Sequence, residues 1–224
     1  MRVRAGQMPI LRQIRAYESL KGMSSRAIEA GRGLHLSLGT GSVVNDTTAD
    51  SLAGLSILEY LSDQAVATGS PPTVSMADPT LMLMAQNVVR ATHVDDPEGA
   101  ELAYQNTRWI APQPAAYAAG VMSIINQEQI EANIFVGNFG DEYLLMGETA
   151  AQQEGRTIGG SSVPQTLPFI YASADETLLG EEIYAAGAYL QKRPVHLASL
   201  MAQDTFRSLI FWVIFIGIIL ATIR

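Results

Sequence analysis

The sequence predicts an α/β fold: a single Rossmann-like domain with a largely parallel sheet flanked by helices, plus one C-terminal transmembrane helix. Short apolar runs alternate with helix-like stretches along most of the chain, and glycines bound several of these runs. Near the C-terminus, residues 208–223 form an uncharged, mostly apolar run between Arg207 and Arg224. We therefore expect an N-terminal amphipathic helical segment (1–30), the α/β domain (31–205) and the transmembrane helix (206–224).

The strands are predicted from short apolar runs that end near glycine or proline. The clearest is 132–140, because its Ile-Phe-Val core is bounded by Gly137 and Gly140. The expected strands are 33–39, 72–78, 107–112, 132–140, 156–162 and 167–174.

The helices are predicted from apolar periodicity together with signals for their ends. A helix over 46–69 has Asp46, Thr47 or Thr48 as its N-cap and Gly69 at its C-terminal end, and Pro79 suits the first turn of the next one. The remaining expected helices are 10–30, 80–93, a short one within 94–105, 114–131, 141–155, and 175–191 ahead of Pro194.

Charge and cysteine content exclude several classes of protein. The 22 acidic residues outnumber the 14 basic ones and no dense Lys/Arg cluster occurs, so we expect no nucleic-acid partner. The absence of cysteine excludes disulfides, a thiolate nucleophile and thiolate metal ligands. The N-terminal stretch has scattered charges, so we expect no cleaved export signal.

The apolar tail predicts a single-pass membrane anchor. Ser208–Ile223 spans about 24 Å as a helix, slightly short for a bilayer core, and apolar side chains occupy every face. A buried core helix is the alternative, although such a helix keeps a polar stripe. Because Lys192, Arg193 and Arg207 precede the run and only Arg224 follows it, we expect the domain to face the cytoplasm.

A glycine-rich turn is the candidate cofactor-binding motif. Gly39, Thr40, Gly41 and Ser42 connect a predicted strand to a predicted helix, where backbone N–H groups can cradle a phosphate. The third glycine in register and a GK[ST] sequence are missing, and acidic residues follow. A tight turn with a helix cap explains the same residues.

Carboxylates follow two predicted strands and are the candidate metal ligands. If the sheet is parallel, these acids gather toward its carboxyl edge, where Asp141, Glu142 and Glu182 could hold Mg²⁺ or Ca²⁺. The alternative is stabilisation of helix N-termini by acids in first turns. The full set of such acids is Asp141, Glu142, Glu148, Asp175, Glu176, Glu181 and Glu182.

No catalytic constellation is recognisable, so we assign no catalytic residue and no cofactor. His35, His93 and His196 form no close ligand pair, and His35 between two leucines is typical of a hydrogen-bonded strand histidine. No G-x-S-x-G nucleophile elbow is present.

Three stretches carry a resemblance to a known family: "GNFGDEYLLMGE", "TLPFIYASADETLLGEEIYAAGAYL" and "AQDTFR". Over about 12–207 the sequence resembles a family of uncharacterised bacterial membrane-associated proteins, a domain of unknown function. The resemblance implies an α/β domain attached to membrane helices. It implies no activity and no functional residue.

Two functions follow from these observations. The first is a membrane-anchored structural or assembly subunit of a homo- or hetero-oligomeric membrane complex, whose partners are membrane lipid and copies of itself or other membrane subunits. Helices with small residues such as "PAAYAAGVM" and "YAAGAYL" would provide the contacts. The alternative is a membrane-tethered enzyme or sensor that binds a nucleotide or small anion, with a divalent cation.

Overall fold

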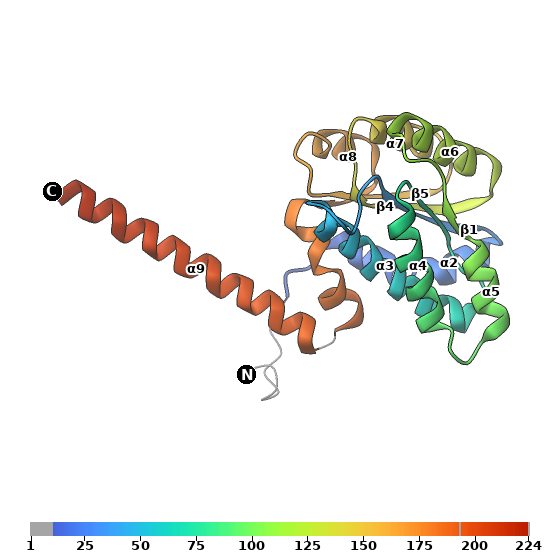
Figure 1. The fold of residues 1–224 in the computed structure, drawn as a ribbon, viewed down its shortest axis with the longest axis horizontal. Coiled ribbons are helices and arrows are strands. Elements are labelled where there is room, and N and C mark those ends of the chain that lie inside the picture. The colour runs from blue at the N-terminus through green and yellow to red at the C-terminus, as the bar shows by residue number, and fades with distance from the viewer. Residues whose placement is uncertain (1–10, 193, 224) are drawn as a thin grey trace. The chain divides into compact units, whose positions relative to one another are not determined.

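The computed structural model describes residues 11–192 and 194–223 (Figure 1). Gln13–Ala186 form one compact unit, and the described parts of Met1–Arg12 and Gly187–Arg224 form a second. The elements are α1 (Arg15–Leu20), α2 (Met23–Ala30), β1 (Gly33–Gly39), α3 (Thr48–Thr68), β2 (Thr73–Met76), α4 (Pro79–Thr92), α5 (Pro97–Gln105), β3 (Thr107–Trp109), α6 (Pro114–Gln127), β4 (Ile130–Asn138), α7 (Glu142–Ala151), β5 (Arg156–Ser161), α8 (Leu167–Ser173), β6 (Glu176–Leu179), η2 (Gly180–Ala185), η3 (Gly187–Gln191) and α9 (Pro194–Ile223).

The sheet has six strands in the order β3-β2-β1-β4-β5-β6, and every neighbouring pair is parallel. This confirms the predicted α/β fold with a parallel sheet. The order is that of doubly wound folds, in which the chain builds one half of the sheet outward from β1 and the other half outward from β4.

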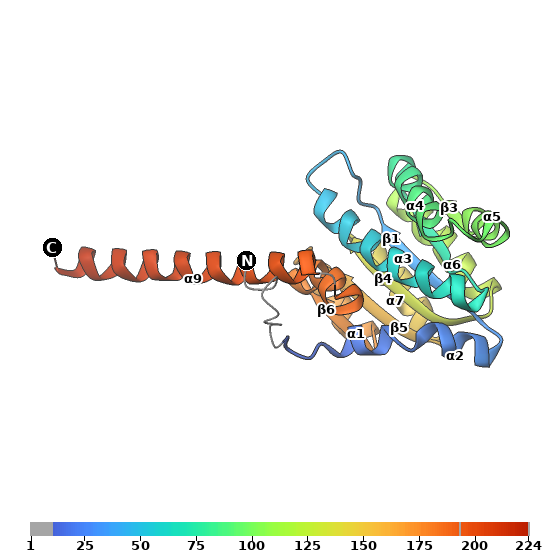
Figure 2. The ribbon, with the colours of Figure 1, turned by 90° about the horizontal axis from the view of Figure 1, so that it is seen from below.

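Helices cover both faces of the sheet. Figure 1 shows α2, α3 and α4 on one side and α6, α7 and α8 on the other, and Figure 2 shows α3 running along β1 and β4. Both faces are therefore shielded from water, as a parallel sheet requires.

On the first face, α3 lies unusually close to the strands. A Cβ atom on Gly54 would lie 2.7 Å from Leu38 Cδ2 and 2.7 Å from the carbonyl oxygen of Val136, so only glycine permits this approach. Leu34, Leu36 and Leu38 of β1 are buried against this layer. The close approach fixes the start of α3 beside the carboxyl ends of β1 and β4.

On the opposite face, aromatic side chains fill the space beneath α6 and α7. Phe135, Phe139 and Tyr143 are fully buried and meet edge to face, with ring centroids 5.5 to 6.3 Å apart. Tyr117 of α6 is also fully buried, and burial raises its pKa to about 12. This layer ties the segment after β4 to the α6–α7 pair.

The prediction for 167–179 was wrong in its secondary structure, whereas the rest of the predicted helix 175–191 is helical over Gly180–Ala185 and Gly187–Gln191. Leu167–Ser173 form helix α8 instead of a strand, because Pro168 suits the first turn of a helix and only Ile170 is fully buried. The sixth strand is instead Glu176–Leu179, which pairs with β5 where a helix had been expected. Gly180, with φ +61°, ends this strand and leads into a 3₁₀ helix.

The ends of the chain also differ from the expected ranges. Where a single helix over 10–30 was expected, two short helices, α1 and α2, are separated by Lys21 and Gly22. Pro194 begins α9, which is one continuous helix of 30 residues and therefore longer than the predicted 206–224. Met1–Ile10, Arg193 and Arg224 lie outside the described residues.

Candidate functional site

The carboxyl edge of the sheet holds the residues predicted to bind a cofactor. In sheets of this order, ligands bind outside the carboxyl ends of the strands where the order reverses, which here is between β1 and β4. Gly39 ends β1 with φ +77°, and a Cβ atom there would lie 2.1 Å from the carbonyl oxygen of Asn138. The turn after β1 is thus pressed directly against the end of β4.

The Gly39–Ser42 turn uses three of its four backbone N–H groups within the protein. Thr40 N–H donates to the carbonyl oxygen of Asn138 at 2.9 Å, and Ser42 N–H donates to Thr47 Oγ1 at 2.8 Å. Gly39 N–H donates to Tyr117 Oη at 3.3 Å. These three donors already have acceptors, so they are not aimed together at a phosphate position.

Asp50, in the first turn of α3, is a buried carboxylate with neutral partners. Only 4% of the residue is exposed. Its oxygens accept hydrogen bonds from Ser162 Oγ at 2.8 and 2.9 Å, from Tyr184 Oη at 2.6 Å and from Asn138 Nδ2 at 3.2 Å. Burial raises the pKa of Tyr184, and the Asp50 carboxylate raises it further because it stabilises the protonated phenol.

Glu142, the first residue of α7, is the second buried carboxylate at this edge. Its Oε1 accepts from Gly140 N–H at 2.8 Å and from Thr40 Oγ1 at 3.3 Å. It therefore bridges the turn after β1 and the turn after β4. The carboxyl edge of these strands thus holds two of the protein's own carboxylates, Asp50 and Glu142, whose field opposes the binding of an anionic ligand.

The three predicted metal ligands differ in their exposure and in their hydrogen-bond partners. Asp141 is exposed, Glu142 bonds the turn described above, and Glu182 Oε2 accepts from Leu179 N–H at 3.0 Å. Within residues 11–192 and 194–223, no group of three or more His, Asp or Glu side chains is spaced to hold a metal ion. The two glutamates act as acceptors for backbone N–H groups near strand ends.

The partners of Asp50 were not identified from the sequence. They lie 88, 112 and 134 residues from it in the chain. Each of them, however, ends a strand or follows one: Asn138 ends β4, Ser162 follows β5 and Tyr184 follows β6. That placement is the signal that could have grouped them, provided the strand order had been known.

His35 lies inside the sheet instead of in a ligand site. Its Nδ1 is 3.1 Å from Asn133 Oδ1 and its Nε2 is 2.9 Å from Ser75 Oγ. Burial lowers the pKa of His35 to about 4, so the ring is neutral at pH 7. The expectation of a hydrogen-bonded strand histidine is confirmed.

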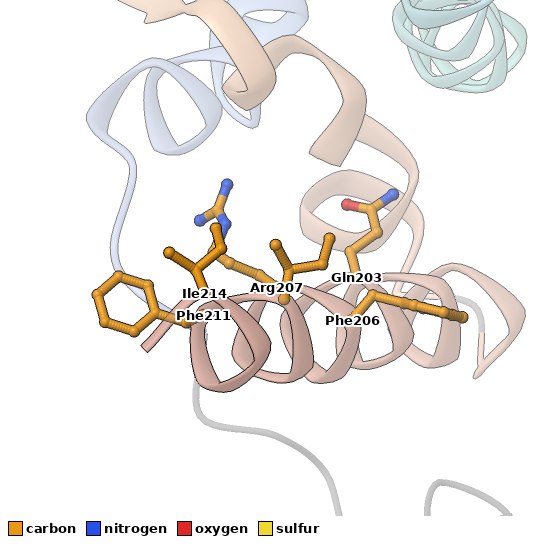
Figure 3. A pocket seen from close by; sticks show the side chains of 6 residues that line it. Gln203, Phe206, Arg207, Phe211 and Ile214 are labelled. Atoms are coloured by element: carbon orange, nitrogen blue, oxygen red, sulfur yellow. The ribbon is translucent and has the colours of Figure 1, made fainter. Parts of the chain in front are cut away.

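Helix α9 presents apolar side chains in every direction. The successive residues Phe211, Trp212, Val213 and Ile214 are 74%, 64%, 64% and 57% exposed, and they cover most of one helical turn. In Figure 3, Gln203, Arg207 and Ile214 line one side of the helix, where a shallow apolar depression also includes Phe206 and Phe211. Residues 194–219 of this helix are long and apolar enough to cross a membrane.

The sequence matches one family model over its full length, residues 1–224, described as Domain of unknown function (DUF6754). No curated protein and no solved structure matches it. The match confirms the resemblance to a family of unknown function and transfers no functional residue. Because the match covers all 224 residues, the chain belongs to the DUF6754 family.

Proposed function

We propose that this chain is a membrane-anchored subunit: α9 crosses a lipid bilayer, the α/β unit works at the cytoplasmic face, and copies of the chain or other membrane subunits assemble with it. The observation that carries the proposal is α9 itself. Its uncharged run 208–223 extends about 24 Å, slightly short of a hydrocarbon core of about 30 Å, and the helix continues on the N-terminal side of that run to a total of about 45 Å. Burying each large apolar side chain is worth about 1.5 to 3 kcal/mol, and lipid offers that burial on all faces at once.

The N-terminal end of the apolar run suits the interface between membrane and water. The aromatic residues Phe206, Phe211 and Trp212 gather at its N-terminal end, where rings lie well at the headgroup level. Arg207 lies within the same turns, and its long side chain can reach the polar headgroups. The cytoplasmic orientation rests on Lys192, Arg193 and Arg207 against Arg224, of which Arg193 and Arg224 lie outside the described residues.

An assembly role is supported by exposed apolar side chains on the α/β unit. Leu144 and Leu145 on α7 are about half exposed, and Tyr171 on the neighbouring α8 is 74% exposed. Exposed apolar groups on adjacent helices are typical of protein–protein contacts. Asp50 and Glu142 place carboxylates at the carboxyl edge beside β1 and β4, so ligand binding at that edge is the second candidate.

That second candidate, a membrane-tethered nucleotide or anion sensor, is favoured by the strand order alone. Its signature is a rise in melting temperature with ATP and Mg²⁺ that disappears in Gly41→Ala, since a ligand that binds only the folded state raises its stability. If ATP and Mg²⁺ produced that rise, the sensor would replace the assembly subunit as the leading function.

Membrane insertion is tested with a charge at the centre of the apolar run. Ile216→Lys should shift the chain out of the alkali-washed membrane fraction, because a lysine at mid-bilayer costs about 3 kcal/mol, on the order of 100-fold in partitioning. Gln203→Lys adds the same charge to α9 outside the apolar run and should stay with the membrane. Unmodified chain recovered in the soluble fraction would rule out the anchor.

Membrane orientation and assembly are measured with the same single-cysteine variant. The chain has no cysteine, so Asp46→Cys places a single thiol on an exposed turn of the α/β unit. A membrane-impermeant maleimide should label this thiol in spheroplasts only after permeabilisation. Light scattering of the detergent-solubilised protein should give a mass above that of the 24.1 kDa monomer, and a strict monomer without copurifying protein contradicts the assembly role.

A further inference from the structure

A second pocket lies at the opposite, amino edge of the sheet. It occupies about 570 Å³ outside the start of β4 and β5, where α6 and α7 end, and this size is within the roughly 300 to 1,000 Å³ of small-molecule sites. Six carboxamide side chains line it: Asn126, Gln127, Gln129, Asn133, Gln152 and Gln153. Each carboxamide offers both donors and an acceptor, so the lining is polar without being mainly charged.

Asn133 is a buried side chain with unused hydrogen-bonding capacity in this pocket. The residue is 1% exposed, and its Oδ1 is paired with His35. Its Nδ2 has no hydrogen-bond partner among the described residues. A buried donor left unpaired costs about 1 to 3 kcal/mol, which makes it an unusual feature unless another molecule accepts from it.

The neighbouring strand repeats the same feature. Thr157 of β5 is in register with Asn133, is 1% exposed, and its Oγ1 is likewise without a partner in the described part of the chain. Side chains in register on adjacent parallel strands are about 4.8 Å apart along the sheet. Two unpaired polar groups thus lie side by side on adjacent strands, and Asn133 is the one that lines the pocket.

Electrostatics determine which molecules this pocket can accept. Helices α6 and α7 both end here, at Gln127 and Ala151, and a helix C-terminus carries partial negative charge. Glu128 and Glu154 add carboxylates, each of which is paired with an arginine: Glu128 with Arg108, and Glu154 with Arg32 at 3.3 Å. The arginines therefore leave no unpaired positive charge for an anion among these contacts. Anionic ligands are therefore disfavoured.

Cationic ligands are disfavoured in this pocket for a different reason. The Asn133 amide is a donor, and ammonium groups have no lone pair to accept from it. The ligand must accept from the buried amide and donate to the helix-end carbonyl groups without carrying a negative charge. Hydroxyl groups do both. We propose that this pocket binds an uncharged, hydroxyl-rich small molecule of the sugar or polyol class, with the Asn133 amide as its buried donor.

The experiment uses the detergent-solubilised full chain and saturation-transfer NMR. The probes are myo-inositol and D-glucose, with acetate and methylammonium as charged comparisons. We expect at least one of the two neutral probes to bind with a dissociation constant of about 10 mM or tighter, and more tightly than either ion. Gln153→Trp, which fills the pocket from an exposed position, should weaken that binding at least about tenfold.

Two further variants separate a site effect from a folding effect. Gln105→Trp makes the same change at the exposed end of α5 and should bind the probe as the unmodified chain does. Asn133→Leu keeps the branching and the number of heavy atoms of the side chain, and it should abolish binding while circular dichroism stays unchanged. The proposal is overturned if neither neutral probe binds, if Gln153→Trp binds equally well, or if acetate or methylammonium binds more tightly.

Discussion

At the carboxyl edge of the sheet, the buried Asp50 carboxylate accepts hydrogen bonds from three neutral side chains. At the amino edge, the equally buried Asn133 and Thr157 each keep one polar atom without a partner in the described residues. The two edges belong to the same sheet and to the same compact unit. They differ in whether the protein itself satisfies its buried polar groups.

This difference bears on where a ligand is expected. The strand order directs attention to the carboxyl edge, because doubly wound folds bind ligands there. In this chain, Asp50 and Glu142 occupy that edge and are held by the protein's own donors. Buried polar groups with hydrogen-bond partners contribute to the stability of the fold. Buried polar groups without partners are stabilised only when another molecule supplies the missing hydrogen bond. The comparison therefore assigns a folding role to one edge and a binding role to the other.

The largest expected effect is at Asp50. Asp50→Ala should lower the free energy of unfolding by about 3 kcal/mol, because it removes the common acceptor of three side chains from a buried position. Urea denaturation of the solubilised chain, followed by circular dichroism, measures the change. Asp46→Ala, on the exposed turn nearby, should change it by less than about 0.5 kcal/mol. Equal effects at both positions would show that the Asp50 cluster contributes nothing specific.

The pH dependence of stability should reveal the next largest effect, at His35 near the amino edge. Burial lowers its folded pKa from 6.5 to about 4, so the unfolded chain binds the proton more readily. Stability from this group is present above pH 6.5 and is lost as the pH falls toward 4, by about 2 kcal/mol between pH 7 and 5. The hydrogen bond with Asn133 and the negative charge of Glu128 raise this pKa in part, whereas the positive charge of Arg108 lowers it further.

The measurement is the difference between the unmodified chain and His35→Gln. Both contain the same other titrating groups, so subtracting their unfolding free energies at each pH isolates the imidazole. The unmodified chain should lose about 2 kcal/mol more than the variant between pH 7 and 5. Parallel curves for the two proteins would mean that His35 is protonated without cost.

The fold was predictable where the local signals were strong. Segments 33–39 and 132–140 were predicted to be strands because each apolar run ends at a glycine. They correspond to β1 and β4 of the sheet. Segment 167–179 was misassigned because its apolar runs are short and interrupted. Whether Glu176–Leu179 is a strand depends on its pairing with β5, which is a tertiary contact that no local pattern contains.

The candidate sites were predictable only in part, for a related reason. Glu142 and Gly39 were expected at the carboxyl edge, since parallel strands bring their following turns together, and they do meet there through Thr40. The Asp50 cluster depends on the order of strands, which the sequence does not state. Asn133 and Thr157 lay inside runs chosen for their apolar neighbours, and only the register of β4 with β5 shows that they are adjacent.

The smallest expected effect compares one buried threonine from each edge. Thr166 Oγ1, near the carboxyl edge, donates to the carbonyl oxygen of Phe139 at 2.5 Å, whereas Thr157 Oγ1 has no partner in the chain as described. Both residues are 1% exposed, so valine replaces each with similar volume and similar burial. Thr166→Val should cost about 1 to 2 kcal/mol because the Phe139 carbonyl group loses its donor, and Thr157→Val less than about 0.5 kcal/mol. Urea midpoints of the two variants at equal m-values measure the contrast. If Thr157→Val were as destabilising as Thr166→Val, the Thr157 hydroxyl would already be satisfied in the unliganded protein, and the two edges would not differ in the way that directs a ligand to Asn133.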